Sequence, residues 1–344
     1  MPPRPRLKPY FRPLRRGPDS VQLGLTGECG GVVLTGLSEA EMLLLGRLDG
    51  SITQTAWCAA AAAAGVSQDR AQRLLDMLAE HRLLVTDPAD RAHLAQLPAE
   101  VRQTLAADAD VLGLAYETPR DGYQRILERR RHHVLVGGSG PLPWAIASLL
   151  RSAGTGRVEL GSWAVDLHEL ALRTGTAPRS DETVPAPDLV ILVAQGVLDP
   201  RLGEPWQRRA VPHLPVVSDG HRVLIGPLAG HAEELPCLRC LDMYRTDRDA
   251  AWPAVMAQLC PETGAAERPV SSESTLVCTA AGLVAMVAHT FLAGEAVPGG
   301  VSLEVAMPWP RLEHRRWHRH PACAGHAGAP WRPEPAPTRA TMAE

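Results

Sequence analysis

The chain has 344 residues, a length that suits two domains with buried cores better than one average domain. Hydrophobic residues make up 45% and charged residues 21%, which excludes a disordered or fibrous protein. The net charge of -3 gives no overall field that would attract nucleic acid or a membrane, so we expect neither as a partner. No apolar segment near the start resembles a signal peptide, and we expect a cytoplasmic, reduced protein.

The first part of the chain predicts a winged helix over residues 21–90, after a basic, proline-rich arm over residues 1–20. Residues 21–35 alternate loosely and contain paired glycines, which predicts a small hairpin. Three short helices follow, and residues 83–85 are expected to return as a strand. Ser38 and Glu41 form a capping box at the start of the first helix, the second helix ends at Gly65, and Ser67 caps the start of the third.

The third of these helices carries Arg70 and Arg73, which in an isolated winged helix would suggest DNA. Acids on the same helix make the balance nearly neutral, whereas duplex binding needs clustered cations; they are Asp69, Asp76 and Glu80. A second use of this architecture is peptide capture, in which a peptide adds a strand to the hairpin edge and lies along the third helix. The predicted peptide site is Val32, Val33, Leu34, Arg70, Arg73 and Met77. The alternative is a winged helix that serves only for dimerisation or as an appendage.

The second part of the chain predicts a doubly wound parallel sheet of Rossmann type over residues 132–328. It follows residues 91–131, whose weak periodicity indicates a linker and then a helix over 121–131. The proline- and alanine-rich residues 329–344 predict a disordered tail. Expected strands cover 133–136, 157–160, 189–194, 215–217, 223–226, 301–306 and 312–317, and expected helices 141–153, 166–173 and 274–293.

Residues 275–294 are long and apolar enough to raise the question of a membrane span. Thr279, His289 and Thr290 interrupt this run, and alanine and glycine dilute it. We therefore expect a buried helix of a water-soluble domain.

A glycine turn at Gly137, Gly138 and Gly140 lies between a strand and a helix, as a nucleotide-binding loop does. Pro141 and Pro143 remove backbone donors that would otherwise face a phosphate. The next strand ends in Gly161-Ser162-Trp163, where an acid would grip a ribose or a metal, and the chain has one lysine, Lys8. These absences indicate a degenerate nucleotide loop, and we do not expect ATP to be used.

Cys237 and Cys240 are separated by two residues and preceded by a proline, a spacing that lets both sulfurs face one ion. Cys323 and His326 can complete a structural zinc site with no open position, and His320 is a reserve ligand. The alternatives are a redox pair or two buried thiols. The remaining cysteines are interpreted as small core residues: Cys29, Cys58, Cys260 and Cys278.

From residue 133 to residue 326 the chain resembles the ubiquitin-activating-enzyme-like superfamily of the ThiF and MoeB type. The resemblance rests on the glycine turn, on residues 153–158, on the Pro236-Cys237-Leu-Arg-Cys240 knuckle and on the late apolar helix. Residues 236–259 are similar to actinobacterial proteins that bind leader peptides of azole-forming precursors, the ThiF-like cyclodehydratase components. In that family the N-terminal winged helix is the recognition element for the peptide.

The resemblance implies a non-catalytic scaffold that holds a precursor by its leader and presents it to a YcaO-type enzyme, which spends the ATP and forms azolines. It also implies a homodimer. Active adenylating relatives carry an acid-x-acid after the second strand and a downstream lysine, which this chain lacks, and His326 stands where relatives more often have cysteine. Two alternatives remain, an ATP-dependent adenylating enzyme of the ThiF/MoeB type and a winged-helix DNA-binding regulator.

Overall fold

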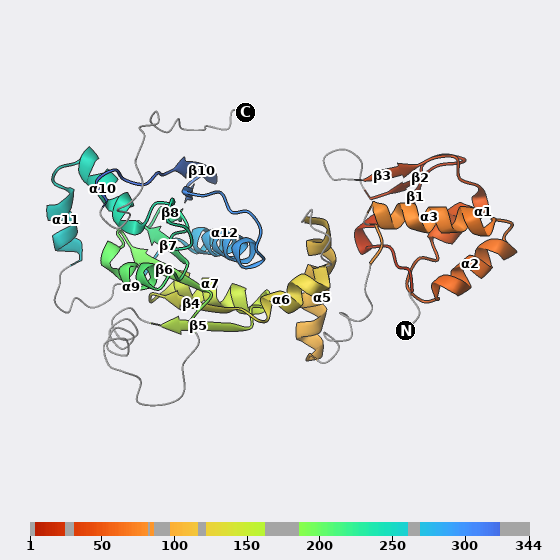
Figure 1. Ribbon diagram of the computed structural model, residues 1–344, viewed down its shortest axis with the longest axis horizontal. Helices are drawn as coiled ribbons and strands as arrows, with labels where there is room; N and C mark the ends of the chain where they lie inside the picture. The colour runs from red at the N-terminus through yellow and green to blue at the C-terminus, as the bar shows by residue number, and fades with distance from the viewer. Residues whose placement is uncertain are drawn as a thin grey trace. The chain divides into compact units, whose positions relative to one another are not determined.

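The structure, a computed structural model, describes residues 4–24, 31–81, 83–85, 97–115, 122–161, 186–260 and 269–323. The chain divides into two compact units, residues 1–127 and residues 128–344 (Figure 1). Each unit has its own hydrophobic core. Several expectations from the sequence lie outside the described residues, among them the helix over 166–173, the tail over 329–344, and Cys29.

Unit 1 contains a three-stranded antiparallel sheet in the order β1-β2-β3, followed by three helices. Trp57 of α2 is fully buried in a core to which α1 and α3 contribute leucines, and its Nε1 donates to Leu44 O at 3.1 Å. The predicted capping box is confirmed, because Ser38 and Glu41 each accept a backbone hydrogen bond from the other. The elements are β1 (Pro13–Arg15), β2 (Val21–Leu23), β3 (Val32–Leu34), α1 (Glu39–Leu45), α2 (Gln54–Ala63) and α3 (Gln68–Glu80).

Two expectations for unit 1 were wrong in detail. The basic arm is part of the fold, because β1 pairs with β2 and Leu7 is buried against the leucine core. Residues 83–85, expected to return as a strand, make only an isolated bridge, between Leu84 and Leu7. The arm therefore lies beside residues 83–85.

The chain continues with α5 (Ala99–Ala115) and α6 (Gly122–Arg129), and the boundary between the two units falls within α6. We expected only the second of these helices, because α5 is rich in alanine and has little apolar periodicity. It contributes Leu105 and Ala109 to a small cluster with Tyr123 and Ile126 of α6. Such sparse burial leaves almost no pattern in the sequence.

Unit 2 is built on a seven-stranded mixed sheet in the order β10-β9-β8-β7-β6-β4-β5. Strands β5, β4, β6 and β7 are parallel, and β8, β9 and β10 are antiparallel, so only half of the sheet is doubly wound. All seven expected strands are present, as β4 (His133–Gly137), β5 (Arg157–Gly161), β6 (Leu189–Gln195), β7 (His213–Ser218), β8 (Arg222–Ile225), β9 (Val301–Ala306) and β10 (Arg311–Arg316).

Helices cover both faces of this sheet (Figure 1). On one face α7 and α12 pack against Ile191 and Val193 of β6, and on the other α9 and α10 pack against Val190 and Leu192. Because β6 is buried on both faces, it reads as a continuous apolar run. The helices of this unit are α7 (Pro141–Ser152), α9 (Glu204–Arg208), α10 (Leu238–Arg248), α11 (Trp252–Leu259) and α12 (Ser274–Leu292).

Helix α12 is, among the described residues, one helix whose length and composition would suffice to cross a membrane. One side of it packs on the sheet through Leu276, Val277 and Val284. Less than half of its apolar stretch is buried, however, so the expectation of a buried helix holds for one side only. Cys278, expected in the core, is exposed.

Candidate peptide-binding edge and metal centre

The terminal strand β3 and helix α3 of unit 1 carry the residues that we predicted to bind a peptide. Strand β3 pairs with β2 on one side, with Gln22 opposite Val33, and is the last strand in the sheet order. Val32 and Val33 are half-buried, whereas Leu34 is 7% exposed and belongs to the core. Leu34 can therefore offer a peptide only its backbone.

Arg70 fastens α3 to the turn that follows β3. Its Nε lies 2.6 Å from Glu41 Oε1, and its guanidinium also donates to Gly36 O at 3.2 Å. Glu41 is buried; burial raises its pKa, but hydrogen bonds from Ser38 and Arg70 outweigh this and hold that pKa below its ordinary value. Arg70 and Glu41 are 29 positions apart in the sequence, and no sequence motif predicts that they form an ion pair.

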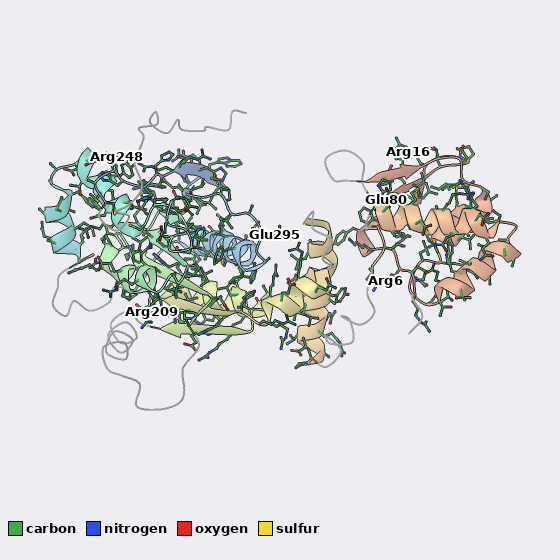
Figure 2. The ribbon with its side chains drawn as sticks, viewed as in Figure 1. Arg6, Arg16, Glu80, Arg209, Arg248 and Glu295 are labelled. Atoms are coloured by element: carbon green, nitrogen blue, oxygen red, sulfur yellow. The ribbon has the colours of Figure 1, made fainter. Side chains whose placement is uncertain are left out.

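Arg73 is exposed on α3, and Met77 is half-buried against the core. Glu80 ends the same helix in an exposed position (Figure 2). Arg70 is held by Glu41, whereas Arg73 faces solvent. The face of α3 thus carries Arg70 in an ion pair, Arg73 exposed to solvent and one methionine, rather than a basic stripe.

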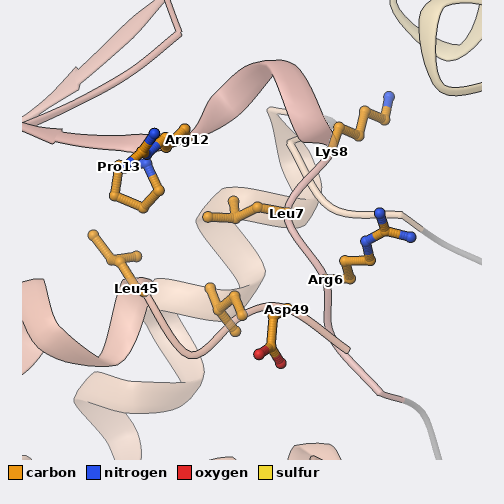
Figure 3. A pocket seen from close by; sticks show the side chains of 9 residues that line it. Arg6, Leu7, Lys8, Arg12, Pro13, Leu45 and Asp49 are labelled. Carbon is orange, nitrogen blue, oxygen red and sulfur yellow. The ribbon is translucent and has the colours of Figure 1, made fainter. Parts of the chain in front are cut away.

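A hollow of about 280 Å³ lies elsewhere in unit 1, beside β1 and the end of α1 (Figure 3). Figure 3 shows Leu7, Pro13 and Leu45 facing one another, while the side chains of Arg6 and Lys8 point away from them. Its volume is just below the range typical of small-molecule sites, roughly 300–1,000 Å³. Because β1 and β3 are opposite ends of the sheet order, this hollow is separate from the predicted peptide site.

Three of the four predicted metal ligands come together at the start of α10. The sulfurs of Cys237, Cys240 and Cys323 lie within 4.8 Å of one another, and all three residues are buried. Cys237 Sγ is 3.6 Å from Cys240 Sγ and 3.8 Å from Cys323 Sγ. Tetrahedral zinc with bonds of about 2.3 Å places two thiolates about 3.8 Å apart, whereas a disulfide bond is about 2.05 Å.

The spacing of this cysteine cluster therefore fits a metal ion and excludes a disulfide among the three. The hydrogen bond with Cys237 and burial raise the pKa of the Cys240 thiol. A bound cation acts in the opposite direction, because ligation requires thiolates. The fourth predicted ligand, His326, lies outside the described residues.

His320 is engaged elsewhere and does not face the sulfurs as a ligand. Its Nε2 lies 2.8 Å from Asp247 Oδ2, and its Nδ1 accepts from Ala322 N at 3.2 Å, so both ring nitrogens have partners. Its carbonyl accepts from Cys323 N at 3.0 Å. His320 thus ties the segment that carries Cys323 to α10. Arg248, at the end of that helix (Figure 2), also contacts this segment: its guanidinium carbon lies 6.0 Å from the centroid of the Trp317 ring.

The glycine turn after β4 is covered by residues 269–272, which we call the covering segment. Val270 N donates to Ser139 O at 2.8 Å, and Val270 is 1% exposed. Gly140 has φ +100°, and a Cβ built on it would lie 2.8 Å from Val270 N. No pattern in the sequence pointed to this contact.

The neighbouring strand end is covered in the same way. Gln195 ends β6, beside β4, and its Oε1 accepts from Ser271 N at 2.9 Å. The carboxyl ends of parallel strands are where such sheets bind ligands. In this chain the covering segment contacts the carboxyl ends of β4 and β6, where it bonds to the backbone of the glycine turn and to the neutral amide of Gln195. Ser162 and Trp163, expected in place of an acid, lie outside the described residues.

No family model matches the chain, and no curated protein matches it in sequence. Solved structures do match it. The heterocyclase TruD superposes with a TM-score of 0.61 at 17% identity, over 94% of this chain and 43% of TruD. A heterocyclase in complex with substrate and cofactor gives 0.62 at 16% identity, over 94% of this chain and 39% of that one. The chain thus spans less than half the length of these heterocyclases.

MccB from E. coli matches along its whole length. Its structure with MccA has a TM-score of 0.56 at 14% identity, over 94% of this chain and 99% of MccB. Its structure with ATP has a TM-score of 0.56 at 12% identity. The sheet, its helices and the preceding unit therefore have the fold shared by TruD and MccB.

Proposed function

We propose that this protein binds the leader of a ribosomally made precursor peptide and presents the peptide to a YcaO-type cyclodehydratase for azoline or azole formation. In this proposal unit 1 is a winged helix that serves as the recognition element. The observation that carries the proposal is the terminal position of β3, with the start of α3 fastened beside it by Arg70. An extended leader can add as a further strand there, since main-chain hydrogen bonds supply affinity.

Side chains around this edge supply specificity in the proposal. Val32 and Val33 offer half-buried apolar positions, and Met77 offers an adaptable one on α3. Arg73 would pair with an acidic side chain of the leader. The MccB structures that contain MccA support peptide binding by this fold.

The proposal treats unit 2 as non-catalytic. Adenylyl transfer depends on cations and metal-binding acids around the phosphates. The covering segment instead packs on the glycine turn, and Gln195 occupies the end of β6. The chain's one lysine, Lys8, belongs to the other unit.

We further propose that the cysteine cluster holds one structural zinc, completed by His326. Three buried sulfurs at tetrahedral spacing support this assignment. With four protein ligands the ion has no position for a water, so it would stabilise the start of α10 against the segment that carries Cys323.

Calorimetry of the full chain with the leader encoded beside its gene tests the proposal. Met77→Asp should weaken binding about tenfold or more, because it places a charge on the apolar contact. Leu43→Asp is the matched control, since Leu43 is an exposed apolar residue of α1 in the same unit, and it should leave binding unchanged. No heat of binding with the wild type, or equal losses in both variants, would refute the proposal.

The alternative is an adenylating enzyme, and one observation favours it: an MccB structure with this fold contains ATP. Peptide-dependent exchange of pyrophosphate into ATP decides between the two. A scaffold gives no exchange above a control without peptide, and exchange that rises with peptide concentration would establish the enzyme.

A further inference from the structure

Strand β10 is a terminal strand of the seven-stranded sheet in unit 2 (Figure 1). Just beyond it, Trp317 N donates to Gly300 O at 2.7 Å, so these two residues form a hydrogen-bonded pair of the antiparallel β9–β10 ladder. Such pairs alternate along antiparallel strands, and every second residue from Arg315 back to Arg311 therefore also bonds to β9. The remaining backbone N–H and C=O groups of β10 point away from β9, and they belong to Leu312, His314 and Arg316.

The turn between β9 and β10 exposes a tryptophan on the same segment. Trp309 is 83% exposed and lies between Pro308 and Pro310, whose rings restrict the backbone on both sides of it. Leu312, three residues further along, is 48% exposed. An aromatic side chain on a restricted backbone loses little freedom on binding and is a typical anchor of protein interfaces. We call residues 309–316 the β10 edge.

The charge of the β10 edge is positive. Strand β10 contains three arginines and one glutamate, and that acid, Glu313, pairs with Arg311 at 3.1 Å. Arg315 lies over the Trp317 ring at 4.1 Å, and Arg316 is exposed on the same face of the strand as Leu312. Like charges opposite one another destabilise a strand pair, whereas opposite charges stabilise it. The edge therefore disfavours pairing with a second copy of itself and favours an acidic strand.

We propose that the β10 edge docks an extended, acidic segment of a partner protein, which adds to the sheet as an eighth strand. The outward backbone groups of Leu312, His314 and Arg316 hold the segment by main-chain hydrogen bonds, and the arginines pair with its carboxylates. Trp309 anchors the end of the segment beside the turn. A nucleic acid could use the same arginines and tryptophan, but it cannot continue a ladder of backbone hydrogen bonds.

This inference goes beyond the proposed function, because the predicted leader site belongs to β3 and α3 of unit 1. Fluorescence anisotropy of a labelled peptide with the full chain tests it. The probe is a short peptide in which glutamate alternates with valine, and the matched peptide has lysine in place of glutamate. The acidic peptide should bind at micromolar concentration, and more weakly as the salt concentration rises, whereas the lysine peptide should not bind. No binding of the acidic peptide, equal binding of both, or tighter binding of a single-stranded oligonucleotide would overturn the proposal.

A proline substitution tests the main-chain contact. His314→Pro removes an outward N–H that makes no hydrogen bond to β9, and edge strands tolerate proline. The variant should lose binding of the acidic peptide. His314→Ala, which keeps that N–H, is the matched control and should change the affinity by less than about twofold. Equal affinities of the two variants would refute strand addition at β10.

The anchor is tested separately, by a variant that leaves the strand backbone unchanged. Trp309→Ala should weaken binding of the acidic peptide at least about tenfold. Trp144→Ala is the matched control, because Trp144 of α7 is a 63% exposed tryptophan of the same unit, and it should leave binding unchanged. Equal effects of these two variants would contradict the proposal, also where His314→Pro fails to fold. Leader binding by Trp309→Ala should equal that of the wild type, so failure here is distinct from failure of the proposed peptide function.

Discussion

The buried pair of Thr155 and His289 makes the stability of unit 2 depend on pH. His289 is 5% exposed near the end of α12, and its Nε2 lies 2.9 Å from Thr155 Oγ1. Burial, together with the positive charges of Arg129 and His132, lowers the pKa of His289 from 6.5 to about 3. The folded protein therefore keeps this imidazole neutral at a pH where the unfolded chain binds a proton.

The sign and size of the effect follow from proton linkage. Between pH 6.5 and about 3 the unfolded state binds more protons at His289, so the free energy of unfolding falls as the pH falls. The slope is about 1.4 kcal/mol per pH unit inside this window. Acidification from pH 7 to pH 5 should remove about 2 kcal/mol through this one residue. The full contribution is present above pH 6.5.

Denaturant unfolding of the wild type and of His289→Gln at pH 7 and pH 5 measures how much the protonation of His289 changes the free energy of unfolding. Glutamine keeps a hydrogen-bonding group near Thr155 but does not titrate. Burial also lowers the pKa of His213 and of His231, so the wild type alone would overstate the effect, and the difference between the two proteins is the quantity to compare. Equal losses of stability in both proteins between pH 7 and pH 5 would refute the reasoning.

Three further predictions concern the metal cluster, the glycine turn and the capping box. Cys237→Ser or Cys240→Ser should remove the one bound zinc ion seen by elemental analysis and partly unfold the C-terminal region, whereas Cys260→Ser, outside the cluster, should keep the ion. A wild type purified without zinc would contradict this. Gly140→Ala should cost at least about 2 kcal/mol more than Gly220→Ala in thermal or denaturant unfolding. Both glycines have φ near +100°, but only Gly140 would drive its Cβ against the Val270 backbone, and equal costs would argue against the covering segment. Glu41→Gln should destabilise unit 1 by about 1–2 kcal/mol at pH 7. Because the pKa of Glu41 is held below 4.5, this difference should shrink as the pH falls through that range, and a difference independent of pH would exclude the ion pair with Arg70 as its source.

The sequence alone determined most of the elements, because their signals are local. Ser38, Glu41 and Ser67 mark helix starts through side-chain caps, and these are present. The apolar run of β6 follows from its burial on both faces of the sheet, and the 3.6-residue period of α3 follows from burial of one face of the helix. The spacing of Cys237 and Cys240 likewise indicated a shared ion before any fold was known.

Only the tertiary structure decided the contacts between residues that are far apart in the chain. It brought Cys323 to the start of α10, joined Arg70 to Glu41, and laid Val270 on the glycine turn. It also placed β1 in the sheet of unit 1 and left one side of α12 open. These outcomes depend on which apolar faces meet as the core forms, a long-range choice that neither helix and strand periodicity nor capping residues encode.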